Sequence, residues 1–395
     1  MDHFICLKTK RPVRLLSAVL MSLIIALLFP AGGYGSVKTS AKDDDLLIFR
    51  KVAYRVLYDD TWYAEATCLA DKEYSGEIEV LPVVMRDGEE FPVRSVGEAA
   101  FAFSDITSVI LPDGLKQIKS SAFAGCSSLE KVYIPKSVKK IGTGVFSYCD
   151  NLELIEVDEN NLHFTTIDSV LYTIDGKELV YAPGSAGEEL SIPEGVEVIR
   201  SFAFEGNDRI VSVRLPETLE KICSGAFFDC NSLDSVVLGR NVSRIEGDSF
   251  AYCSLSSLCI DGDNAYYCVD DQKLLLDRKK KHLICAAAAS GTVVIPDKVR
   301  YIDECSCSGN KKIEKLIIHS RVKSIGAYAF CDCSSLFYVA FRSRKTAFEP
   351  GSNVFAGLPY FAEFNIPYSQ NEEDINSYKE LIKSNSPSGA VITTR

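Results

Sequence analysis

Residues Ser121 to Gly142, SAFAGCSSLEKVYIPKSVKKIG, decide the fold of this chain, because their pattern returns along most of its 395 residues. The fixed positions are an apolar pair, a cysteine, a leucine, a short strand that ends in proline, and two aliphatic residues: Ala122-Phe123, Cys126, Leu129, Val132-Tyr133-Ile134-Pro135, Val138 and Ile141. A period of about 20 to 29 residues is typical of a solenoid, in which each unit packs only on its neighbours.

The phenylalanine of the pattern measures the period. It recurs at eight positions, and a cysteine takes its place at a ninth: Phe101, Phe123, Phe146, Phe204, Phe227, Phe250, Cys307, Phe330 and Phe355. Most steps are 22, 23 or 25 residues, but two are 58 and 57. A block of three units is therefore duplicated at a spacing of 103 residues, with an insert in the third unit. We predict about nine turns over residues 99–368, with inserts near 159–189 and 262–292.

Each unit also carries a strand with one buried side. Its apolar residues follow the spacing L-x-x-L-x-L, which places alternate side chains on one face of a strand. The frame occurs at Leu129, Val132 and Ile134, and again at Ile106/Val109/Leu111, Leu152/Ile155/Val157, Ile210/Val213/Leu215, Leu233/Val236/Leu238, Ile313/Leu316/Ile318 and Leu336/Val339/Phe341. One such unit buries too little to fold alone, so we expect a β-rich repeat solenoid of short, stacked parallel strands.

The recurrent A-F-x-x-C-x-x-L-x-x-V-x-I-P-x-x-V-x-x-I-G resembles the BspA-like leucine-rich repeats of bacterial surface proteins, over about 270 residues. The ends are similar too, with the leader GEIEVLPVVMRDGEEFPVRSVGEAAF before the repeats and Ser377-Tyr378-Lys379 after them. The departures are local: Asn207 and Asn310 replace the cysteine, and Cys307 replaces the phenylalanine. The resemblance implies a leucine-rich repeat solenoid that serves adhesion or other binding at the bacterial surface.

The two ends of the chain differ from the repeats. Residues 1–35 have the form of a signal peptide, with basic residues, the apolar run Leu15–Phe29 and then small residues. That run is short for a membrane span, which needs about 20 residues. We expect cleavage near Gly35 and no membrane insertion afterwards, and a retained N-terminal anchor is the alternative. A solenoid exposes its core at both ends, so we expect residues 36–98 to form a linker and a β-rich cap and residues 369–395 a C-terminal cap or tail.

The two inserts align with each other at an offset of 103 residues. In the first, two apolar runs flank Asp175-Gly176, which is a strong β-hairpin signal. In the second, a basic run replaces that turn: Arg278, Lys279, Lys280 and Lys281. Insertions in a solenoid map to one face, often the face that binds a partner. Lys279, Lys280 and Lys281 are therefore candidate binding residues, and the alternative is that the hairpins only extend the sheet.

Fourteen cysteines in an exported protein first suggest disulfides. Five of them, however, share one position three residues after the anchor, where asparagine stands in other units: Cys126, Cys149, Cys230, Cys253 and Cys333. We expect this position to satisfy backbone groups of the stacked turns. Two alternatives stay open, a zinc site from two C-x-C pairs and a disulfide across the second hairpin: Cys305/Cys307 with Cys331/Cys333, and Cys268 with Cys285.

Composition and motifs argue against several function classes. A formal net charge of −11 suits neither nucleic acid nor anionic lipid. The four histidines lie in different contexts, and no nucleophile and base converge in the sequence: His3, His163, His282 and His319. We therefore expect no enzyme activity, no cofactor and no metal.

The remaining candidate site is a surface. In each strand the residue between the two inward positions points outward: Ile110, Tyr133, Glu156, Arg214, Val237, Cys259, Ile317 and Ala340. Strands lie about 4.8 Å apart, so nine turns would align this column over roughly 40 Å. A contiguous apolar stripe is typical of a site for a protein or glycan, and the alternative is that β propensity alone selects these residues.

The residues alone predict an exported binding module without catalysis. The resemblance implies that it is a surface or secreted protein, adhesin-like in its role, whose partner would be a protein or glycan, for example on a host surface or in the extracellular matrix. A periplasmic location is also compatible. The alternative is an envelope scaffold that self-associates through the apolar strand face.

Overall fold

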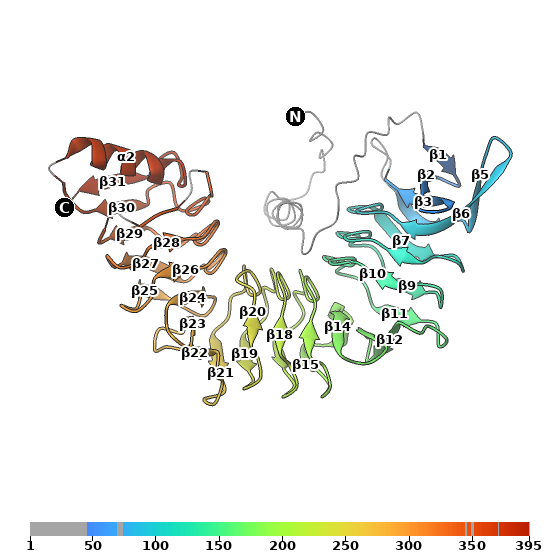
Figure 1. Ribbon diagram of the computed structural model, residues 1–395, viewed down its shortest axis with the longest axis horizontal. Coiled ribbons are helices and arrows are strands. Elements are labelled where there is room, and N and C mark those ends of the chain that lie inside the picture. The colour runs from blue at the N-terminus through green and yellow to red at the C-terminus, as the bar shows by residue number, and fades with distance from the viewer. Residues whose placement is uncertain (1–45, 69–73, 344–345, 349–350, 370, 395) are drawn as a thin grey trace.

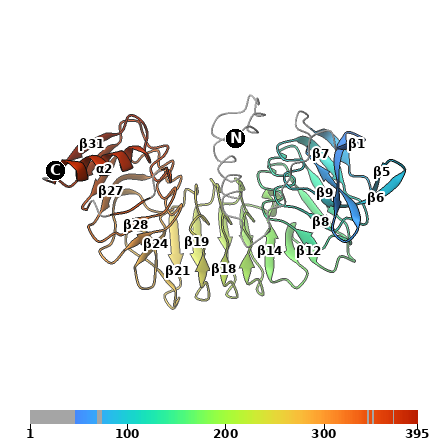
Figure 2. The same ribbon diagram turned by 45° about the horizontal axis from the view of Figure 1, so that its top comes forward.

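The chain forms an open arch of stacked turns (Figure 1). The computed structural model describes residues 46–68, 74–343, 346–348, 351–369 and 371–394. The expected signal peptide, residues 1–35, lies outside these ranges. The first described strands lie at one end of the arch and helix α2 (Glu372–Lys383) at the other, as the tilted view also shows (Figure 2).

Most turns contribute one longer strand and one strand of two residues. The longer strands lie along the outer edge of the arch in Figure 1 and pair in parallel: β7 (Asp105–Ile110), β9 (Lys131–Ile134), β11 (Leu154–Val157), β15 (Glu189–Ser191), β17 (Ser212–Arg214), β19 (Ser235–Leu238), β21 (Ser257–Ile260), β25 (Gly291–Val294), β27 (Ile313–Ile318), β29 (Tyr338–Phe341), β30 (Glu363–Ile366) and β31 (Val391–Thr394). The short strands lie nearer the inner edge: β8 (Gln117–Ile118), β10 (Lys140–Ile141), β16 (Val198–Ile199), β18 (Lys221–Ile222), β20 (Arg244–Ile245), β26 (Tyr301–Ile302) and β28 (Ser324–Ile325). The predicted fold class, a β-rich leucine-rich repeat solenoid, is confirmed.

The anchor phenylalanines stack along the core, one turn on the next. The rings of Phe101 and Phe123 lie 5.4 Å apart and nearly parallel, as do those of Phe227 and Phe250 at 5.3 Å. Aromatic rings at this separation gain contact energy beyond the area they bury. The period counted from these residues is therefore the period at which the turns stack.

The cysteine position carries a ladder of hydrogen bonds between turns. Each Sγ donates to the carbonyl of the anchor one turn earlier: Cys126 to Phe101 (3.0 Å), Cys149 to Phe123 (3.2 Å), Cys230 to Phe204 (3.1 Å), Cys253 to Phe227 (2.9 Å) and Cys333 to Cys307 (3.1 Å). Where asparagine stands, Nδ2 of Asn207 donates to the Ala182 carbonyl and Nδ2 of Asn310 to that of Ala286. The expected backbone role of this position is confirmed, and burial raises the pKa of the Cys126 thiol to about 12.

The two inserts add turns of their own, so the prediction of nine turns is too low, and the arch has about 12. Each insert forms three strands: β12 (Phe164–Ile167), β13 (Val170–Thr173) and β14 (Glu178–Tyr181), then β22 (Tyr267–Val269), β23 (Leu275–Asp277) and β24 (His282–Cys285). β13 and β14 pair antiparallel around Asp175-Gly176, as the hairpin signal predicts. β14 then pairs in parallel with β16, and the Tyr181 ring packs 5.5 Å from that of Phe146. The insert thus fills a place in the core without the repeat signature.

The two ends of the solenoid core are covered differently. At the first, Tyr74 packs its ring 4.9 Å from that of Phe101, among β1 (Leu47–Phe49), β2 (Val52–Tyr58), β3 (Trp62–Thr67), β4 (Ser75–Glu79), β5 (Val83–Arg86) and β6 (Glu89–Val96). At the other, α2 buries Ile375, Tyr378 and Ile382, and Asn371 caps its first turn by accepting a hydrogen bond from the Glu373 amide. Within the described ranges, no helix has the length and apolar character needed to cross a membrane.

Candidate binding surfaces

The outward strand residues form three separate rows. The longer strands belong to three sheets, β4-β7-β9-β11, β15-β17-β19-β21 and β25-β27-β29-β30-β31. The expected single column is therefore wrong. After β11 and after β21 the chain enters an insert whose strands join the sheet of short strands. The row of outward side chains is interrupted at both places.

Within each sheet the register places the predicted residues side by side. Tyr133 lies opposite Glu156, and Ile110 is next to Tyr133 because Val109 pairs with Val132. Two further rows of predicted residues follow in the other sheets: Arg214, Val237 and Cys259, then Ile317 and Ala340. The third row also contains Val294, which pairs with Ile317 and was not predicted.

The exposure of these side chains decides which rows a partner can reach. Ile110 is 51% exposed, Tyr133 44% and Val237 61%, and Glu156 and Arg214 are also exposed. Ile317 is only half-buried. Ala340 was expected to point outward but is fully buried, because it is short and lies between the larger Ile317 and Asn365. The first two rows are thus the better candidates.

A groove of about 440 Å³ lies beside the first row, with Tyr133, Glu156, Asp158, Glu159, Asn160 and Thr166 in its lining. The Tyr133 hydroxyl donates to Oδ2 of Asp158 at 2.7 Å, and the Asn160 amide donates to Oδ1 at 2.8 Å. The hydrogen bond from Tyr133 lowers the pKa of Asp158, and the same bond raises the pKa of Tyr133 to about 12. The groove combines an aromatic ring with a charged carboxylate.

The basic turn of the second insert belongs to the sheet β22-β23-β24-β26-β28, which contains short strands and none of the outward rows. Lys279, Lys280 and Lys281 are exposed between β23 and β24, and Oδ1 of Asp277 accepts the amides of Lys281 and His282. β24 pairs with β26 among the short strands. The structure therefore brings the three lysines together with one another, but not with the outward rows on the longer strands.

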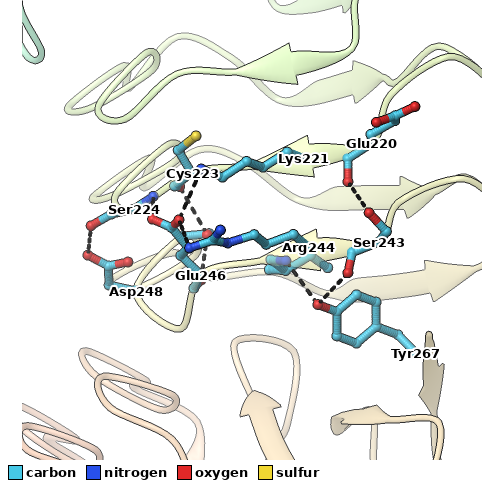
Figure 3. Close-up of polar contacts among 11 residues, drawn as sticks. Glu220, Lys221, Cys223, Ser224, Ser243, Arg244, Glu246, Asp248 and Tyr267 are labelled. Carbon is cyan, nitrogen blue, oxygen red and sulfur yellow. Dashed lines mark hydrogen bonds and ion pairs between the residues drawn. The ribbon is translucent and has the colours of Figure 1, made fainter. Parts of the chain in front are cut away.

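The face of the short strands carries a polar network around Glu246 (Figure 3). Its Oε1 lies 3.3 Å from both Nζ of Lys221 and Nη2 of Arg244, and its Oε2 accepts a hydrogen bond from the Ser224 amide at 2.6 Å. The Ser224 hydroxyl in turn donates to Asp248 at 2.6 Å, and burial raises the pKa of Asp248. The charged and polar groups of this network are thus paired with one another across two turns, which indicates a structural role.

The two alternatives for the cysteines find no support. The thirteen cysteines of the described residues are free, including Cys268 and Cys285, which lie opposite Leu276 and Leu275 in β23. Among the described residues no group of three or more potential ligands is placed to hold a metal ion.

A contact across each insert was missed by the sequence reasoning. The Tyr148 hydroxyl donates to Asp229 at 3.3 Å, and the Tyr252 hydroxyl donates to Asp332 at 2.6 Å. The sequence did contain a signal for these contacts, because each of the four residues lies two positions after an anchor phenylalanine, and the two pairs occupy matching places in the duplicated blocks. The partners are 81 and 80 residues apart in the sequence, so the spacing within one repeat does not reveal that they meet.

Comparison with known proteins agrees with this architecture. The family model of the BspA type leucine rich repeat region matches in 6 copies over residues 90–174, 184–267 and 287–384. No curated protein sequence matches the chain.

Similar solved structures include a leucine rich cell surface protein from Faecalibacterium prausnitzii, with 22% identity, TM-score 0.48, and coverage of 88% of this chain and 94% of that one. A leucine-rich repeat protein from Eubacterium ventriosum has 18% identity, TM-score 0.45, and coverage of 88% and 95%. The pneumococcal vaccine antigen PcpA has 19% identity, TM-score 0.39, and coverage of 89% and 98%. On the family match, the chain belongs to the BspA-type leucine-rich repeat proteins.

Proposed function

We propose that the chain is an exported binding protein of the bacterial surface or surroundings, adhesin-like and without catalysis, that holds a protein or glycan partner on its longer strands. The observation that carries this proposal is the exposure of Ile110 and Tyr133, which are neighbours in the first row, and of Val237 in the second row, on sheets whose inward residues are buried. Exposed aromatic and aliphatic side chains on a rigid scaffold lose little entropy on binding. Membership of the family and the surface proteins among the similar structures support the location.

The test replaces the exposed rows without touching the core. The variant Ile110→Glu/Tyr133→Glu/Val237→Glu should lose capture of host cells or immobilised extracellular matrix by at least tenfold, while its circular dichroism and melting stay as in the wild type. The control is Lys140→Glu, which adds negative charge on the exposed side of a short strand. Capture that survives in the folded triple variant overturns the strand rows as the site and makes Lys279, Lys280 and Lys281 the next residues to change.

Self-association as an envelope scaffold is the second candidate. It is favoured by β31, an edge strand whose neighbourhood exposes Tyr360, Phe361 and Val391, because an unpaired edge beside apolar side chains invites pairing with another chain. Light scattering separates the two candidates: a monomer at high micromolar concentration refutes the scaffold.

A further inference from the structure

The two inserts create two equivalent junctions between neighbouring loops. At the first, the Tyr148 amide donates to the Glu205 carbonyl at 3.3 Å, and at the second the Tyr252 amide donates to the Ser308 carbonyl at 2.9 Å. The loop before each insert thus contacts the loop after it directly. Residues after each insert correspond at an offset of 103, so Glu205, Asp208 and Arg209 in the first junction match Ser308, Lys311 and Lys312 in the second.

The second junction holds an ammonium group of its own chain. Nζ of Lys312 reaches back across the insert and donates to the carbonyls of Ser254 at 2.9 Å and Leu255 at 3.1 Å. Lys312 is half-buried there. The space between the loops can therefore accept a lysine side chain, and the carbonyls of the preceding loop are placed to bind its ammonium.

The first junction has the same architecture, but its lysine is missing. A cavity of about 180 Å³ lies there, lined among others by Tyr148, Asp150, Tyr181, Glu205, Asp208 and Arg209. Arg209, which matches Lys312, is exposed to solvent. Since about 10 to 15 Å³ of such space is enough to hold one water molecule, the cavity has room for the four carbons and the nitrogen of a lysine side chain.

The lining of the first junction is more acidic than that of the second junction, although Arg209 adds one positive charge to it. Glu205, a residue that is only 4% exposed, stands where the second junction has Ser308, and Asp208 stands where it has Lys311. Asp150 adds a third carboxylate to the lining. A buried carboxylate attracts a cation more strongly than an exposed one, because water screens it less.

We propose that the cavity of the first junction binds the ammonium group of a lysine from a protein partner, in the position that Lys312 fills in the second junction. This inference rests on the proposed function and names a part of the partner's chemistry. A compact ammonium with three donors suits carbonyl and carboxylate acceptors converging from two loops, whereas a planar guanidinium needs a flat, forked acceptor.

The experiment titrates the full chain with the peptide acetyl-Ala-Lys-Ala-amide and, as the control ligand, acetyl-Ala-norleucine-Ala-amide, which lacks the ammonium. Binding is followed by calorimetry or by chemical shifts at the junction. The wild type should bind the lysine peptide at least tenfold more tightly than the norleucine peptide. Glu205→Gln should reduce that preference, and the melting temperature checks that the variant folds.

Two substitutions at Arg209 separate occupancy from charge. Arg209→Lys keeps the charge but should place an internal ammonium in the cavity, as Lys312 does, and lower affinity for the lysine peptide at least tenfold. Arg209→Ala leaves the cavity open and should bind as well as the wild type or better. Equal affinity of Arg209→Lys and the wild type overturns the proposal, as does equal binding of the two peptides.

These outcomes do not depend on capture of the natural partner. If the peptides fail to discriminate while the strand-row variant still loses capture, the cavity proposal falls and the proposed function stands. If the wild type prefers the lysine peptide but the strand-row variant still captures its target, the cavity proposal stands and the strand rows are not the site.

Discussion

Asp229 should make the stability of the arch depend on pH. It accepts hydrogen bonds from the Tyr148 hydroxyl at 3.3 Å and from Nδ2 of Asn231 at 2.9 Å, and so links the loops on the two sides of the first insert. Burial raises its pKa to about 6, the nearby Asp208 acts in the same direction, and Lys311 lowers it slightly. The folded protein therefore binds this proton more tightly than the unfolded chain does.

The sign and size follow from that difference. A carboxyl whose pKa is raised on folding contributes stability that is complete below the unfolded value near 4 and is lost as the pH rises through about 6. A rise of about two units corresponds to about 3 kcal/mol at most, because each unit is worth about 1.4 kcal/mol. With an unfolding entropy of about 2.1 cal/mol/K per residue, a folded part of roughly 350 residues converts this into about 4 °C of melting temperature.

The variant Asp229→Asn removes the titration and keeps the shape of the side chain. Between pH 3 and 8, calorimetric melting should show the wild type losing about 4 °C relative to the variant, mostly between pH 4 and 6, the interval between the unfolded and folded pKa values. The control Asp208→Asn should retain most of the dependence, because burial and not Asp208 is the main cause of the shift. A difference between wild type and Asp229→Asn that is constant across this pH range would refute the reasoning.

Three further predictions concern the ladder, a crowded glycine and export. Cys149→Asn should change the free energy of unfolding in urea by less than about 1 kcal/mol, since asparagine already fills this position in two turns. Cys149→Leu should cost about 2 to 4 kcal/mol, because it loses the hydrogen bond to the Phe123 carbonyl and crowds the core. Equal losses of stability in the two variants would contradict the ladder. Gly206→Ala should cost more than Gly195→Ala, because both have positive φ but only at Gly206 would the new Cβ lie 2.4 Å from the Tyr148 ring; equal melting temperatures contradict this packing. Intact-mass analysis of the exported protein should show loss of residues up to about Gly35, and a mass that includes Met1 would rule out cleavage.

Much of the fold could be predicted from the sequence, because the same spacing of residues in every repeat shows how successive turns align. Phe123 and Cys126 recur at a constant spacing, and each recurrence marks the same place in the stack. The inserts were read only in part, because Tyr181 and Cys285 take core positions without the flanking residues that identify a turn elsewhere. Helix α2 was likewise expected only as a cap or tail.

The candidate sites divide along the same line. The exposed Tyr133 and Val237 and the basic turn at Lys279 follow from strand alternation and charge, which are local properties. The break of the outward column into three rows follows from which sheet each insert strand joins, and a sequence without partners does not contain that information.

By itself the sequence determined the solenoid, its period, its inward and outward positions and the bonding role of the cysteines, because each depends on contacts between adjacent copies of one unit. Only the tertiary structure decided how the chain crosses the inserts, where Tyr148 reaches Asp229 and where the space that Lys312 fills in one junction stays open in the other. Those features join residues more than 50 positions apart, and their geometry depends on how a whole inserted turn packs between two blocks.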